Sequence, residues 1–78
     1  MRRSDEHVDG AGLSFREVEI LRRVSRGDSN KVIAYDLELS VSTVATHLSQ
    51  ASRKLGLGPK VLVHAALVLG RLADRLDM

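Results

Sequence analysis

The sequence predicts an all-α fold, built as one small domain of four helices. The chain has 78 residues, which is room for a single domain, and an apolar share of 44% is enough for one core. From Leu13 onward the apolar residues recur at the spacing of helices, and no alternating run is long enough for a strand. We therefore divide the chain into a flexible N-terminal arm, residues 1–12, and a four-helix domain, residues 13–76.

The first predicted helix begins after Ser14 and ends at Gly27, a residue typical of a left-handed C-cap. Ser14 and Glu17 have the spacing of a capping box, in which each side chain accepts a hydrogen bond from the other residue's backbone N–H. Glu17 also falls on the apolar face of this helix. Two explanations stay open: the capping box alone, or an inward ion pair with Arg53 or Lys54.

Two further helices are expected close together. The segment 28–30 supplies the N-cap of a short helix that reaches about Glu38, and Ser40 is the expected N-cap of a helix over residues 41–55. The brief turn between them is typical of a helix-turn-helix. Helical spacing predicts the core stripe of the longer helix as Val44, Leu48, Ala51 and Leu55.

The opposite face of the predicted helix 41–55 is unusual for a surface that faces water. It has small side chains and no acid, whereas Glu and Lys are common on solvated helices. Such a face suits a helix that lies in a nucleic-acid groove, where bulk and negative charge are penalised. The residues expected near base edges are Ser42, Ala45, Thr46 and Ser49, and Arg53 extends the row. A second row suited to hydrogen-bonding phosphates comprises Thr43, His47, Gln50 and Lys54.

A fourth helix is expected from Pro59 to about Arg75. Its apolar surface is more than twice as wide as the roughly 100° stripe that a surface helix needs, so another chain or domain is expected to cover part of it. We predict a homodimer through this helix. The contact residues are expected to be Val61, Ala65, Val68, Leu69 and Leu72.

Charge is unevenly distributed along the chain. Twelve basic residues against ten acidic ones give a net charge of +2, yet no acid occurs between Glu38 and Asp74. This asymmetry indicates a surface that faces a polyanion, and chance in a short chain is the alternative explanation.

Several classes of function are excluded by composition. The chain has no Cys, and its three His residues lack metal-ligand spacing, so we expect no metal and no cofactor. No nucleophile–base pair is recognisable, so we expect no catalytic residues and no enzyme. No signal peptide, membrane span or small-molecule site is evident, which predicts a cytoplasmic protein with no membrane partner.

Four blocks of sequence in the same order resemble one family. Residues 13–21, LSFREVEIL, are similar to the pattern L-[TS]-x-R-E-x-E-V-L that opens the LuxR-type (GerE-like) DNA-binding domain of bacterial transcription regulators. The similarity continues through Gly27, residues 29–37, residues 39–47 and residues 53–56, and it covers about residues 13–70. The resemblance implies a four-helix LuxR-type helix-turn-helix domain that binds double-stranded DNA, with the third helix in the major groove and the fourth as the dimer contact.

The resemblance also implies roles for individual residues. Lys31 would lie close to a phosphate, Thr43 and His47 near the sugar-phosphate backbone, and Ser40 would cap the recognition helix. Arg53 and Lys54 match the family's basic pair.

Two positions depart from the family pattern. Ala45 stands where a Lys is common, and Gln50 stands where an Asn is common. The loss of a Lys removes one cation from the side of the helix that would face DNA.

Two functions stay open. The first is a sequence-specific, dimeric DNA-binding transcription regulator of modest specificity, because short hydroxyl and methyl groups contact a thymine methyl or one acceptor but form no bidentate pair. The alternative is a protein-interaction module of the same fold that has lost DNA binding and pairs with other regulators through the fourth helix. Ala45→Lys separates them: DNA affinity rises from almost nothing under the alternative, and by an increment under the first.

Overall fold

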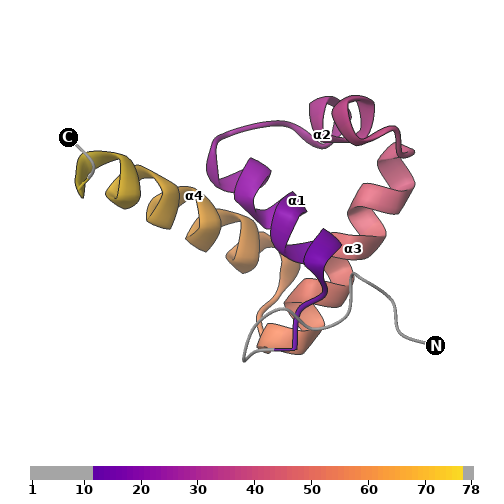
Figure 1. The fold of residues 1–78 in the computed structure, drawn as a ribbon. Helices are drawn as coiled ribbons and strands as arrows, with labels where there is room; N and C mark the ends of the chain where they lie inside the picture. The colour runs from indigo at the N-terminus through magenta and orange to yellow at the C-terminus, as the bar shows by residue number, and fades with distance from the viewer. Residues whose placement is uncertain (1–11, 77–78) are drawn as a thin grey trace.

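The computed structural model describes residues 12–76 and places four helices in them (Figure 1). The helices are α1 (Phe15–Ser25), α2 (Asn30–Leu37), α3 (Val41–Leu55) and α4 (Pro59–Leu76). No strand occurs within these described residues, so the predicted all-α fold is confirmed. The predicted arm lies outside the described residues, apart from Gly12.

A serine caps the start of each of the first three helices. The hydroxyl oxygens of Ser14, Ser29 and Ser40 each accept a hydrogen bond from the backbone N–H of the residue three positions later, at 3.1, 3.2 and 3.0 Å. The predicted capping box is present, since the Ser14 backbone N–H donates to Glu17 Oε1 at 2.9 Å. These caps satisfy N–H groups that have no partner inside a helix.

The helix ends also follow local chemistry. Gly27 adopts a φ of 94°, and the Asp28 N–H closes the end of α1 on the Arg23 carbonyl at 3.1 Å. Such a left-handed turn is easiest for glycine, as predicted. α2 stops at Leu37, one residue before the expected end, because Glu38 is left-handed with a φ of 59°.

The core lies where α1, α2 and α3 meet. Its largest fully buried side chains are Ile20, Ile33 and Val44, one from each helix. A second buried cluster attaches α4 and consists of Leu13, Ala51 and Leu62. The core stripe predicted for α3 is confirmed, with Leu55 only half-buried at its end.

α4 leaves the body of the domain at a sharp angle. It is bent by 88° relative to α3, packs mainly against α1, and its C-terminal end projects past the other helices (Figure 1). Within residues 12–76, no single helix combines the length and hydropathy needed to cross a membrane; only α3 and α4 taken together, as a bent pair, reach both.

At Gly70 the backbone of α4 lies close to the last residue of α1. A Cβ atom at this position would overlap the Ser25 carbonyl oxygen and would lie 2.9 Å from its carbon, so the contact needs a residue without a side chain. Gly70→Ala should therefore destabilise the fold by about 1–3 kcal/mol through overpacking, although alanine is the better helix former. Thermal unfolding followed by circular dichroism measures the effect, as a melting temperature lower by about 5–15 °C.

Gly58→Ala is the control for this substitution. No atom lies within 4 Å of a Cβ built on Gly58. The control should change stability by less than about 0.5 kcal/mol, as is usual for surface positions. A Gly70→Ala variant that is as stable as the unmodified chain would show that α4 does not depend on this close contact.

Candidate nucleic-acid interface

The predicted polar row on α3 forms one exposed face of that helix. Its residues lie opposite the buried Val44, Leu48 and Ala51, and all of them are exposed. We call this surface the outer face of α3; it consists of Ser42, Ala45, Thr46, Ser49 and Arg53. It has no acidic residue, so nothing on it repels a polyanion.

The second predicted row is less exposed than the outer face and contacts α1 through Lys54. Thr43, His47 and Gln50 are half-buried, and the Lys54 ammonium binds both carboxylate oxygens of Glu17, at 2.9 and 3.1 Å. The ion-pair explanation for Glu17 is therefore confirmed, and the capping box alone is not the full explanation, because Glu17 completes the capping box and also forms the ion pair. The partner is Lys54 rather than Arg53, and the pair ties α1 to α3.

Glu17 is ionised despite being buried. Its side chain is 2% exposed, and burial raises the pKa of the carboxyl. The hydrogen bond from the Ser14 backbone, the hydrogen bond and charge of Lys54, and the charge of His47 together hold this pKa below its usual value. His47 Nδ1 is buried without a hydrogen-bond partner among residues 12–76.

A hydroxyl cluster fixes the start of α3. Ser40 Oγ donates to Thr43 Oγ1 at 2.8 Å and lies 3.1 Å from Ser42 Oγ. Ser40 also accepts the Thr43 backbone N–H, so three side chains hold the turn between α2 and α3. This turn spans residues 38–40, and it sets the position of the outer face relative to α2.

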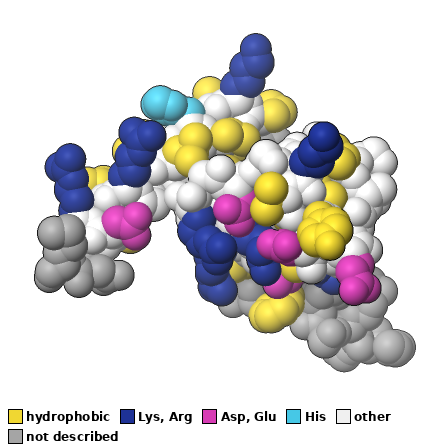
Figure 2. Space-filling view, turned by 90° about the horizontal axis from the view of Figure 1, so that it is seen from above, with side chains coloured by type: hydrophobic (Ala, Val, Ile, Leu, Met, Phe, Trp, Pro, Cys, Tyr) yellow, Lys and Arg dark blue, Asp and Glu magenta, His cyan; other side chains and the backbone are white. Residues whose placement is uncertain are grey.

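Ion pairs neutralise most of the acids in the described region. Besides Glu17, the carboxylates of Glu19, Asp28 and Asp36 each pair with an arginine, at 3.5, 3.6 and 2.9 Å. In the described region, two acidic residues have no ionic partner, Glu38 and Asp74. The basic residues of this region without an ionic partner are more numerous: Arg22, Lys31, Arg53, Lys60, Arg71 and Arg75. Figure 2 shows acidic side chains over the body, and basic, histidine and apolar side chains without acids along the upper edge of the view.

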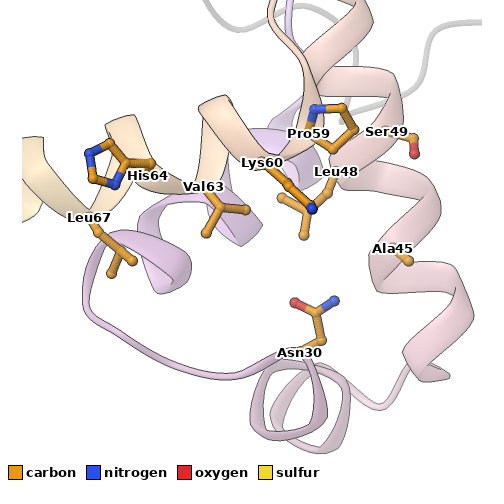
Figure 3. A pocket seen from close by; sticks show the side chains of 9 residues that line it. All are labelled: Asn30, Ala45, Leu48, Ser49, Pro59, Lys60, Val63, His64 and Leu67. Atoms are coloured by element: carbon orange, nitrogen blue, oxygen red, sulfur yellow. The ribbon is translucent and has the colours of Figure 1, made fainter.

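A hollow of about 500 Å³ borders the outer face on one side (Figure 3). Asn30 of α2 and Lys60 of α4 point into it from opposite sides, and Ala45 and Ser49 form its α3 edge. Neither Asn30 nor Lys60 was predicted from the sequence as a site residue. The only signal for Lys60 was its place in the stretch without acids, because its proximity to α3 depends on the bend before α4.

The residues predicted for the dimer contact form an exposed apolar stripe on α4. Val61, Val68, Leu69 and Leu72 are 56%, 42%, 63% and 49% exposed, and Ala65 is half-buried. Leu62 and Ala66 are also part of the wide apolar surface of α4, but they pack in the core of the domain. The width of the apolar surface thus has two causes: one side packs on α1, and the other is uncovered.

Within residues 12–76, no group of three or more His, Cys, Asp or Glu side chains is arranged to hold a metal ion. What the structure does provide is a short helix, a tight turn and a longer helix whose outward face is polar and free of acids. This is the arrangement of a helix-turn-helix domain, a class that binds DNA through its second helix.

The chain belongs to the family described as bacterial regulatory proteins, luxR family, whose sequence profile matches residues 11–68. The suggested resemblance is thus confirmed, and membership in a family of regulators confirms that the chain is not an enzyme. No solved structure gives a significant match.

Relatives with known names are regulators. The chain is 35% identical to the glycerol metabolism activator of Pseudomonas putida over 65 residues, 77% of this chain and 29% of that protein. It is 39% identical to the probable transcriptional regulatory protein NarL of Mycobacterium tuberculosis over 62 residues, 80% of this chain and 29% of that one. It is 48% identical to the oxygen regulatory protein NreC of Staphylococcus aureus over 48 residues, 62% of this chain and 22% of that one. The chain thus spans less than a third of the length of these relatives.

Proposed function

We propose that this chain is the DNA-binding domain of a bacterial transcription regulator, acting as a homodimer on nucleoid DNA in the cytoplasm. The observation that carries the proposal is the outer face of α3, which is exposed, free of acids and flanked by cations without ionic partners. Two copies of α3 would enter successive major grooves about one helical turn apart on a roughly palindromic site.

The site residues divide into two groups in this proposal. Four residues of the outer face meet base edges, and these are Ser42, Ala45, Thr46 and Ser49. Those that meet the sugar-phosphate backbone are Lys31, Thr43, His47, Gln50, Arg53 and, from its place beside the hollow, Lys60. Ser40 supports these residues by capping the start of α3. Lys54 forms the ion pair with Glu17, and its contact with DNA is secondary to that role.

Fluorescence anisotropy of a labelled mixed-sequence DNA duplex, titrated at low salt, tests the proposal. Binding that weakens as salt is added is the expected result, because cations that neutralise phosphates release counterions. Absence of binding even at low salt would contradict it. That outcome would favour the alternative, an interaction module, for which the uncovered apolar stripe of α4 is the supporting observation.

The dimer contact predicts a loss of self-association when a charge enters the stripe. Val68→Asp and Leu69→Asp should each halve the mass measured by light scattering, because an unpaired carboxylate in an apolar contact is costly. Both side chains are exposed in a single chain, so the helical circular dichroism should be retained. Arg71→Asp, on the polar side of α4, is the control and should leave the mass unchanged. A Leu69→Asp variant that keeps the mass of a dimer would place the contact elsewhere.

A further inference from the structure

The hydroxyl protons on the outer face of α3 are largely used within the protein. Thr46 Oγ1 donates to the Ser42 backbone carbonyl at 3.0 Å, one helical turn earlier. Ser40 gives its single proton to Thr43 Oγ1, so Ser42 supplies the proton in its own contact with Ser40. Ser42 and Thr46 therefore have no hydroxyl proton left to donate to a base.

What remains exposed is mainly methyl groups. The Thr46 hydroxyl is bonded to the Ser42 carbonyl and the residue is exposed, so the Cγ2 methyl is the part of this side chain that is left for a contact. Ala45 adds a second methyl, and its short side chain lets the helix lie close to the groove floor. Ser49 has the only hydroxyl of this face without a hydrogen-bond partner among residues 12–76.

The major groove contains one apolar group, the C5 methyl of thymine. We propose that Thr46 is a specificity-determining residue whose Cγ2 methyl contacts this thymine methyl. The inference rests on the proposed function and names the chemical group that the outer face recognises. One buried methyl contributes about fourfold in affinity, and a dimer on two half-sites gains about 15-fold.

Two pairs of duplexes isolate the methyl group. Alternating dA·dT and dA·dU duplexes of equal length differ only in the C5 methyl, as do alternating dI·dC duplexes with cytosine or 5-methylcytosine. Anisotropy titrations at low salt should give affinities about 4- to 15-fold higher for the methylated member of each pair.

Two variants of Thr46 serve as matched probes. Thr46→Ser keeps the hydroxyl and removes the methyl, so the preference for methylated duplexes should fall to less than about twofold. Thr46→Val keeps a methyl and removes the hydroxyl, so the preference should persist. Position 46 is exposed, and circular dichroism of both variants should match that of the unmodified chain.

The outcomes separate this inference from the function on which it rests. Salt-dependent binding that is equal for dA·dT and dA·dU would overturn the methyl contact and leave DNA binding standing. A preference that survives in Thr46→Ser would overturn the assignment to Thr46. If no duplex binds at low salt, the proposed function fails, and the inference fails with it.

Discussion

DNA affinity is expected to fall by about 10³- to 10⁴-fold between 50 and 200 mM salt. Lys31, Arg53 and Lys60 are cations without an ionic partner in the described region; Arg53 belongs to the outer face of α3, Lys60 lines the hollow beside it, and Lys31 is exposed on α2. Three such cations per subunit would neutralise six phosphates in a dimer, which gives a slope of log K against log salt of about −5. Should Lys54 leave Glu17 for a phosphate, the slope becomes about −7. Anisotropy titrations at four or five salt concentrations measure it.

Arg53→Gln tests whether the slope arises from the outer face. The substitution removes one cation per subunit, so the slope should become less steep by about 2 in a dimer. Arg75→Gln is the matched control, because Arg75 is also exposed and unpaired but lies on the projecting end of α4. Equal slopes for the Arg53 variant and the unmodified chain would show that DNA contacts a different surface.

Features set by neighbouring residues could be predicted from the sequence. Ser14 and Gly27 act within one turn of the chain, through a side-chain cap and a left-handed backbone. The buried stripe around Val44 follows from helical spacing alone, because residues three or four positions apart lie on the same face of a helix. The bounds of α3 are as predicted for the same reason.

Features that depend on how helices cross could not be predicted. Arg53 and Lys54 are adjacent in sequence, and the path of α1 across α3 decides that Lys54 meets Glu17. From the sequence alone, Gly70 is only a weak helix former. The reason for a glycine at this position is the close approach of α4 to Ser25, which leaves no space for a side chain. The position of Lys60 beside Ala45 could not be predicted either, because it depends on the bend between α3 and α4.

Lys54→Met is expected to lower the free energy of unfolding by about 2 kcal/mol. The substitution keeps an apolar stem of similar length but leaves the carboxylate of Glu17 buried without its cation. Removing one partner of a fully buried pair costs about 3–5 kcal/mol, and the value is smaller here because the Lys54 side chain is 36% exposed. Urea denaturation followed by circular dichroism measures the loss.

Two comparisons assign this loss to the ion pair. Arg53→Met changes the adjacent cation, which has no ionic partner among residues 12–76, and should alter stability by less than about 0.5 kcal/mol. The double variant Glu17→Gln with Lys54→Met should be more stable than Lys54→Met alone, because no buried charge is then left unpaired. Equal losses for Lys54→Met and Arg53→Met would show that the pair does not stabilise the domain.

The same carboxylate makes the stability depend on pH in a defined direction. The pKa of Glu17 is lowered in the folded chain, so the unfolded chain takes up a proton at a higher pH than the folded chain does. The stability that ionised Glu17 contributes is therefore complete above the unfolded value of about 4.3, and it is lost as the pH falls through the lower folded value. Glu17→Gln has no such group, so its stability deficit relative to the unmodified chain should be largest near neutral pH and should shrink as the pH falls below about 4. Urea denaturation of both proteins from pH 7 to pH 3 measures this difference, and a deficit that stayed constant or grew in acid would mean that Glu17 is not held ionised by its partners.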